Sequence, residues 1–145
     1  MIDYTYEYPR PAVTVDGLIF NKSGEILLIR RAKEPYAGKW AFPGGFLEID
    51  ELLADGCRRE IEEETCLKVG KLTQFRAYDG ITRDPRDRTI SIVFYGFAED
   101  DTGLQGSDDA AEARWFSIEH LPPLAFDHDV IIGDFLEFRK LHIRK

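Results

Sequence analysis

Residues 45–67, GFLEIDELLADGCRREIEEETCL, decide which fold this chain adopts, because they combine a helical pattern with a high concentration of acidic residues. On a helix of about 3.6 residues per turn, Glu60, Glu63 and Glu64 fall within an arc of roughly 100°. Like charges at these spacings repel one another. Hard cations such as Mg²⁺ bind carboxylate oxygens and can bridge to the phosphates of a substrate. The acidic face therefore predicts a site for a divalent cation.

The other face of the same helix is apolar. Leu53, Cys57 and Ile61 recur every four residues, which is typical of a helix that packs against a core. Asp50 precedes this stripe, and a short acidic side chain there is typical of a helix N-cap. We therefore expect an amphipathic helix capped by Asp50, with its carboxylates on the side away from the core.

The acidic residues also stand at fixed distances from an upstream glycine and from a following apolar residue. The pattern consists of Gly45, Glu51, the run Arg59-Glu60-Ile61, the pair Glu63-Glu64 and Leu67. In this spacing the segment resembles the signature box of the Nudix hydrolases. The resemblance implies the Nudix fold, an α/β/α sandwich with a mixed central β-sheet, and hydrolysis of a pyrophosphate bond.

One position departs from the Nudix pattern. Where the family has glycine after the paired glutamates, this chain has Cys66. That glycine normally ends the helix at positive φ, a conformation that costs a non-glycine residue roughly 1 kcal/mol. The departure concerns the end of the helix and leaves the expected metal ligands in place.

The resemblance also implies a role for each polar residue of the box. The expected ligands of Mg²⁺ or Mn²⁺ are oxygen atoms, namely the carbonyl of Gly45 and the carboxylates of Glu60, Glu63 and Glu64. Arg59 is expected to orient these glutamates by ion pairing and so completes the catalytic group; a plain surface pair with Glu63 is the alternative. Glu51 fits a supporting position beside the same site.

The general base is left open by the sequence. In Nudix proteins it can be a glutamate of the box or an acid on a loop outside it. Glu60 therefore competes with Asp108, Asp109 and Glu112 in the stretch GSDDAAEARWF. Those three residues could equally belong to a solvated turn and the start of a strand.

Composition limits the class of protein. With 145 residues, 43% of them hydrophobic, the chain is expected to form one domain over residues 1–145 rather than to be disordered. No apolar run approaches the roughly 18 residues of a membrane span, and residues 1–11 lack the pattern of a signal peptide, so a cytoplasmic protein without membrane contact is expected. A net charge of −8 argues against a nucleic-acid partner but not against a nucleotide-type small-molecule substrate.

The remaining pattern predicts strands around the box helix and a second helix at the end. The expected strands are 12–20, 25–31, 71–78, 89–98 and 113–117, the expected loops are 32–45 and 79–88, and the expected second helix is 129–142. Strands of this kind around one central helix indicate an α/β sandwich.

Substrate choice is expected to come from outside the box. The loop GITRDPRDRTIS carries Arg83, Arg86 and Arg88, and with residues 121–131, LPPLAFDHDVI, it resembles the Nudix branch that hydrolyses ADP-ribose. Arginines on such a loop can pair with phosphate or ribose oxygens; simple solubility is the alternative. His128 could contact the substrate or serve as a cap, and aromatic residues such as Tyr36 and Trp40 include candidates for stacking on adenine.

Three functions follow from the resemblance. The first is Mg²⁺-dependent cleavage of ADP-ribose, or of a related nucleoside diphosphate derivative, to AMP and a sugar phosphate. The second is a pyrophosphatase that removes oxidised nucleoside triphosphates, and the third is a sensor that binds an ADP-ribose-type ligand without hydrolysis. The ADP-ribose branch also implies a homodimer.

Overall fold

The computed structural model describes residues 4–100, 102–106 and 110–142. In chain order the elements are β1 (Ala12–Phe20), β2 (Ile26–Arg31), β3 (Trp40–Ala41), β4 (Gly44–Phe46), α1 (Leu53–Thr65), β5 (Leu72–Tyr78), β6 (Thr89–Phe97), β7 (Ala110–Phe116) and α2 (His128–His142). Within these ranges no helix combines the length and the apolar composition needed to cross a membrane.

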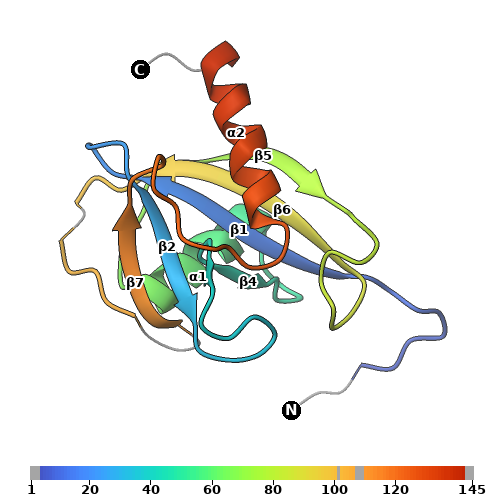
Figure 1. Ribbon diagram of the computed structural model, residues 1–145. Coiled ribbons are helices and arrows are strands. Elements are labelled where there is room, and N and C mark those ends of the chain that lie inside the picture. The colour runs from blue at the N-terminus through green and yellow to red at the C-terminus, as the bar shows by residue number, and fades with distance from the viewer. Residues whose placement is uncertain (1–3, 101, 107–109, 143–145) are drawn as a thin grey trace.

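β1 organises the sheet (Figure 1). The strand order is β3-β2-β1-β6-β5, with β4 paired to β1 and β7 paired to β2. β1 runs parallel to β6, placing Ala12 opposite Thr89, and antiparallel to β4, placing Thr14 opposite Phe46. The loop that precedes β6 and the strand that begins the box therefore both lie beside the first half of β1. The mixed sheet therefore places the loop that carries Arg83, Arg86 and Arg88 beside the box.

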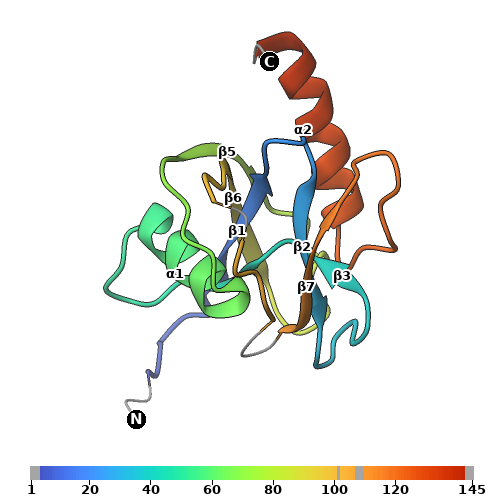
Figure 2. The ribbon, with the colours of Figure 1, turned by 90° about the vertical axis from the view of Figure 1, so that its left-hand side faces the viewer.

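Two helices cover the two faces of the sheet (Figure 2). Side chains of β1 alternate between them: Val15 and Ile19 pack in the core under α1, whereas Leu18 and Phe20 pack in the core under α2. This alternation is the two-residue period of a strand buried on both sides. The predicted α/β/α sandwich with a mixed central sheet is confirmed.

The predicted long strands and both helices are confirmed, with shifts of a few residues at some ends. The predicted loop 32–45 also contains the short strands β3 and β4, which were not predicted. Strands of two and three residues are too short to show an alternating pattern, so their pairing depends on neighbours distant in sequence.

The prediction that Asp50 caps α1 is wrong. The N-cap is Leu52, in extended conformation and without a side-chain capping hydrogen bond. Instead, the backbone N–H of Glu48 donates to Oε1 of Glu51 at 2.9 Å, so Glu51 closes the turn before the helix. Glu51, a residue of the box, therefore stabilises the start of α1 in place of Asp50.

The other end of α1 takes the geometry expected at the family's glycine position. Cys66 has φ 63° and ψ 11°, in the left-handed region, and its backbone N–H donates to the carbonyl oxygen of Glu62 at 2.9 Å. The cysteine therefore ends the helix as glycine would, at the energetic cost of a β-carbon in this conformation.

Candidate active site

Two glycines of β4 allow α1 to approach the sheet closely. The backbone N–H of Gly44 donates to Oε1 of Glu64 at 2.7 Å, and a β-carbon on Gly44 would overlap the carbonyl oxygen of Val15. A β-carbon on Gly45 would lie only 2.5 Å from Oε2 of Glu60. The strand and the acidic helix face are in contact because both positions lack a side chain.

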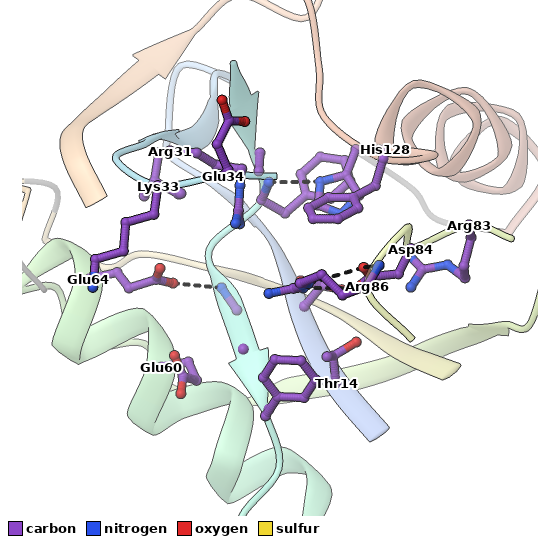
Figure 3. A pocket seen from close by; sticks show the side chains of 18 of the residues that line it. Thr14, Arg31, Lys33, Glu34, Glu60, Glu64, Arg83, Asp84, Arg86 and His128 are labelled. Atoms are coloured by element: carbon purple, nitrogen blue, oxygen red, sulfur yellow. Dashed lines mark hydrogen bonds and ion pairs between the residues drawn. The ribbon is translucent and has the colours of Figure 1, made fainter. Parts of the chain in front are cut away.

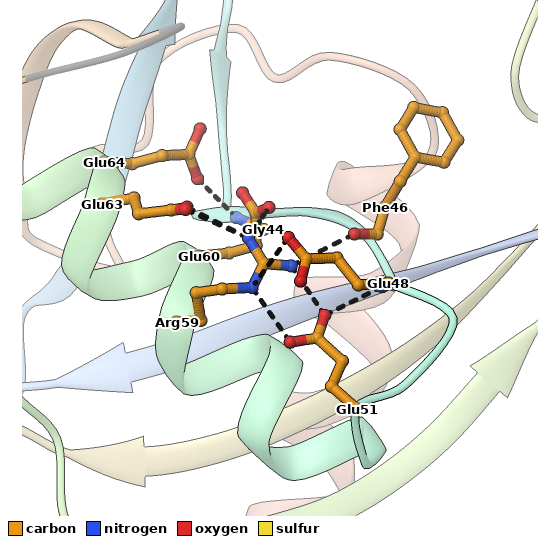
Figure 4. A network of polar contacts seen from close by, with 8 residues as sticks. All are labelled: Gly44, Phe46, Glu48, Glu51, Arg59, Glu60, Glu63 and Glu64. Atoms are coloured by element: carbon orange, nitrogen blue, oxygen red, sulfur yellow. Dashed lines mark hydrogen bonds and ion pairs between the residues drawn. The ribbon is translucent and has the colours of Figure 1, made fainter. Parts of the chain in front are cut away.

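Arg59 lies at the centre of the acidic face (Figure 4). Its Nη2 donates to Glu51 at 2.7 Å and its Nε to the other oxygen of Glu51 at 3.0 Å. Its Nη1 donates to Glu60 at 2.7 Å and to Glu63 at 3.0 Å. The hydrogen bond from Arg59 holds the pKa of Glu51 below its usual range, and the three carboxylates in turn raise the pKa of Arg59. One guanidinium therefore holds Glu51, Glu60 and Glu63 together, whereas Glu64 accepts from the Gly44 amide.

Glu60 and Glu64 are the more enclosed glutamates. The side chain of Glu60 is 18% exposed, that of Glu63 is 41% exposed, and Glu64 is buried. Burial raises the pKa of Glu60, although its hydrogen bond with Arg59 opposes that shift. A carboxylate that is costly to keep charged in a dry site gains most from a nearby cation.

The donor chemistry of this face suits a hard divalent cation. Carboxylate oxygens of Glu60 lie against Gly45, where only the absence of a β-carbon leaves room for them. Among the described residues, no three His, Cys, Asp or Glu side chains are grouped as a ready set of metal ligands. The glutamates instead share Arg59 and the Gly44 amide as partners.

A cavity of about 310 Å³ opens beside the box (Figure 3). Six residues of the predicted site line it, namely Gly45, Arg59, Glu60, Glu64, Arg83 and Arg86. Figure 3 shows Glu60 and Glu64 across the cavity from Arg83 and Arg86. Glu63 and Arg88 are not among the described residues that line the cavity.

Arg83 forms one wall through a buried ion pair. Its Nε and Nη2 donate to the two carboxylate oxygens of Asp127 at 2.9 and 2.7 Å, and its side chain is only 5% exposed. This bidentate pair ties the β5–β6 loop to the segment before α2. Arg83 thus shapes the cavity and places a charge beside it.

Arg86 is the more accessible arginine of the cavity. It donates to Asp84 from Nε at 3.0 Å and from Nη2 at 2.7 Å, while 40% of its side chain stays exposed. Burial works to raise the pKa of Asp84, but the hydrogen bonds from Arg86 outweigh it and hold that pKa below its usual range. Asp84 therefore fixes the guanidinium and leaves its Nη1 edge for other partners.

Arg88 has local partners. Its Nη1 donates to the carbonyl oxygens of Asp79 at 2.9 Å and Gly80 at 3.4 Å, and so braces the loop in which it lies. A role in binding substrate stays a prediction for this residue.

The candidates for the general base are separated by the fold. Glu60 lines the cavity, whereas Glu112 lies on β7 and pairs with Arg30 at 3.4 Å and closely with Arg114. Asp108 and Asp109 lie outside the described residues. Among the described candidates, Glu60 is the one beside the cavity.

Two buried polar side chains of the cavity were not assigned such places from the sequence. Asp16 on β1 accepts a close hydrogen bond from the hydroxyl of Ser91, and burial raises its pKa to about 6. Nδ1 of His128 accepts a hydrogen bond from the backbone N–H of Phe42 at 3.1 Å, and burial lowers its pKa to about 3. The signal for Asp16 was present, because a carboxylate in the apolar run AVTVDGLIF is unusual in a buried strand.

Other lining residues carried no sequence signal. Arg31 and Lys33 reach the cavity from the end of β2 and the loop after it, and Phe126 reaches it from the turn before α2. Nothing in their local sequence distinguishes them from surface or core residues. They become part of the site through the tertiary fold alone.

Known proteins share this fold. The family model described as NUDIX domain matches residues 10–136. The chain belongs to the Nudix hydrolase family, as predicted from the box. An ADP-ribose pyrophosphatase of Methanocaldococcus jannaschii is 44% identical over 134 residues, which are 91% of this chain and 77% of that protein.

Two further relatives contain the fold as part of a longer chain. The ADPR responsive transcriptional repressor NtrR of Acinetobacter baylyi is 32% identical over 129 residues, 84% of this chain and 52% of that protein. The crystal structure of a bifunctional NMN adenylyltransferase/ADP ribose pyrophosphatase from Francisella tularensis, complexed with AMP and Mn ion, has a TM-score of 0.80 at 29% identity. It covers 92% of this chain and 43% of that chain.

Proposed function

We propose that this Nudix protein uses a divalent cation to hydrolyse ADP-ribose, or a closely related nucleoside diphosphate derivative, to AMP and a sugar phosphate. The observation that carries the proposal is the cavity in which the box glutamates Glu60 and Glu64 lie opposite Arg83 and Arg86. The similarity to the Methanocaldococcus jannaschii ADP-ribose pyrophosphatase supports the choice of substrate.

The box residues have defined roles in this proposal. Mg²⁺ or Mn²⁺ would be held by the carboxylates of Glu60, Glu63 and Glu64 and by the carbonyl oxygen of Gly45. When bound, such a cation supplies a water of lowered pKa and neutralises charge on the phosphate oxygens. Arg59 keeps Glu60 and Glu63 in place. Glu60 accepts the proton of the attacking water, because it is the described candidate that lines the cavity.

The arginine side of the cavity meets the diphosphate. Arg86 is held by Asp84 at one edge and offers its Nη1 edge to phosphate oxygens. Arg83 contributes its positive charge while its donors remain on Asp127. The two sides therefore bracket a diphosphate between acidic and basic groups, with the cation required on the acidic side.

The similarity to NtrR favours one second candidate, a sensor that binds ADP-ribose without hydrolysis. A pyrophosphatase acting on oxidised nucleoside triphosphates stays a prediction from the sequence. The single domain, the homodimer and the cytoplasmic location also stay predictions.

A substrate screen tests the proposal. The purified protein is incubated with Mg²⁺ and either ADP-ribose, NADH, diadenosine polyphosphates, or canonical and oxidised triphosphates, and the products are separated by chromatography. AMP from ADP-ribose, at a kcat/KM well above the others, is expected. Pyrophosphate from a triphosphate would contradict the proposal, and tight binding of ADP-ribose without turnover would favour the sensor.

A further inference from the structure

Phe46 is an exposed aromatic residue at a cavity whose other large apolar side chains are more enclosed. It is 46% exposed, whereas the cavity-lining residues Ile29 and Phe42 are buried. Arg59 donates to its backbone carbonyl, and Figure 4 shows its ring pointing away from the Arg59 network. The ring therefore presents apolar surface at the cavity, and covering that surface with a ligand would be favourable.

Arg86 links Phe46 to a second ring. Its Cζ lies 5.1 Å from the ring centre of Phe46 and 5.7 Å from that of Phe126, both within cation–π distance. Asp84 holds the same guanidinium by two hydrogen bonds, so its position is fixed. Phe46, Arg86 and Phe126 thus form one preorganised surface, called here the Phe46–Arg86–Phe126 surface.

Phe126 is itself held in a conformation that costs energy. Its φ is 52°, and Tyr36, whose ring centre lies 4.8 Å away in an edge-to-face arrangement, has φ 62°. The guanidinium of Arg31 lies 5.1 Å from the Phe126 ring. Non-glycine residues at positive φ concentrate at functional sites, where the surrounding structure maintains the strain. The ring is therefore held by Tyr36, Arg31 and Arg86.

The chemistry of this surface matches one half of the proposed substrate. A nucleobase is planar and stacks on aromatic rings and on guanidinium planes. A sugar phosphate has no flat apolar face and needs hydrogen-bond donors instead. Phe46 directly follows Gly45, the proposed metal ligand. The phosphates attached to a base stacked on the Phe46 ring would therefore lie close to the proposed metal site.

Resting on the proposed function, we propose that the Phe46–Arg86–Phe126 surface binds the nucleobase half of ADP-ribose, and that the ribose 5-phosphate half lies elsewhere in the cavity. The base stacks on Phe46, and the Nη1 edge of Arg86 is directed to the adjoining phosphate.

Inhibition by the two products distinguishes the halves. In Phe46→Ala the inhibition constant for AMP should rise about tenfold or more, since loss of one stacking ring has an effect of this order. The inhibition constant for ribose 5-phosphate should not change. Phe46→Leu, which keeps an apolar side chain but no ring, should resemble Phe46→Ala. Phe97→Ala is the matched control, because Phe97 is 59% exposed on β6 and does not line this cavity.

Each outcome decides the proposal. A rise for ribose 5-phosphate with AMP unchanged would overturn it, as would equal values for wild type and Phe46→Ala. Direct calorimetric binding of AMP to both proteins, with melting temperatures to verify folding, repeats the test without turnover. If wild type binds AMP through Phe46 but does not cleave ADP-ribose, the proposed function fails and this inference stands. If wild type cleaves ADP-ribose but Phe46→Ala leaves the affinity for AMP unchanged, this inference fails and the proposed function stands.

Discussion

The three glutamates proposed as metal ligands, Glu60, Glu63 and Glu64, have different environments. Glu63 is partly exposed and pairs with Arg59, whereas Glu64 is buried and accepts from the Gly44 amide. Glu62 lies on the same helix, is exposed and does not line the cavity. Charge removal at Glu62 is therefore a matched control for charge removal at its neighbours.

We expect Glu63→Gln and Glu64→Gln each to lower kcat for ADP-ribose by about 100-fold or more, because removal of one electrostatic partner from a catalytic site has effects of this size. Steady-state assays at saturating Mg²⁺ measure the loss, and Glu62→Gln should behave as wild type. Circular dichroism should show folded protein in all three. Near-normal turnover in Glu63→Gln and Glu64→Gln would argue against the metal assignment.

Substitution of Cys66 tests the energetic cost of its left-handed backbone conformation. Because its φ is 63°, Cys66→Gly should stabilise the protein by up to about 1 kcal/mol, a rise of about 2 to 4 °C in melting temperature for a chain of this size. Cys66→Ala removes the thiol but keeps the β-carbon, so it should show no such gain. A lower melting temperature for Cys66→Gly would show that the cysteine side chain contributes more than its conformation costs.

At the scale of the element, the three arginines of the β5–β6 loop have different roles in structure and in binding. Arg83 forms the buried pair with Asp127, Arg86 remains accessible beside the cavity, and Arg88 braces the loop through carbonyl oxygens. The three residues are alike in sequence, yet their partners differ. Alanine at each position should therefore have a different combination of effects on stability and on substrate binding.

We expect Arg83→Ala to destabilise the fold by about 2 to 3 kcal/mol, below the usual cost of breaking a buried pair because Asp127 is 24% exposed. Arg86→Ala should raise KM for ADP-ribose about tenfold, as a charge-assisted phosphate contact is lost. It should also lower the melting temperature, because the buried carboxylate of Asp84 loses its ion-pair partner. Chemical denaturation and steady-state kinetics measure the two effects, with Arg88→Ala as the comparison. A KM effect of equal size in Arg86→Ala and Arg88→Ala would contradict this division.

The same loop shows what the sequence can and cannot predict. Periodicity identifies α1, α2 and the long strands, because each is long enough to repeat its pattern. The spacing of the box likewise predicts that Arg59 and Glu60 belong to one site. The sequence does not predict that Asp127 neutralises Arg83 or that Phe126 reaches the cavity, since these contacts join segments that only the folded sheet brings together.

At the scale of the whole molecule, two buried titratable groups respond to pH in opposite directions. His128 has its pKa lowered from 6.5 to about 3 by burial, and Asp16 has its pKa raised from 3.8 to about 6 by burial. One begins the helix on one face of the sheet, and the other lies on the central strand. Both stay neutral in the folded protein over much of the range from pH 4 to 6.

The direction in which each group changes the unfolding free energy with pH depends on whether the folded or the unfolded state binds more protons. Below pH 6.5 His128 is protonated in the unfolded chain but not in the folded protein. The unfolding free energy therefore decreases as pH falls towards 3. Above pH 3.8 Asp16 loses its proton in the unfolded chain but keeps it in the folded protein. The unfolding free energy therefore decreases as pH rises towards 6. Between pH 4 and 6 the two slopes oppose each other.

Single variants should separate these slopes, each of which can reach about 1.4 kcal/mol per pH unit. For His128→Gln, which retains an acceptor for Phe42, the loss of unfolding free energy relative to wild type should shrink as pH falls from 6.5 to 4. For Asp16→Asn the loss should shrink as pH rises from 4 to 6. Urea unfolding of the three proteins at each pH unit measures both differences. Parallel curves for wild type and either variant would show that the group concerned titrates alike in the folded and unfolded states, and that burial between the sheet and its helices does not hold it neutral.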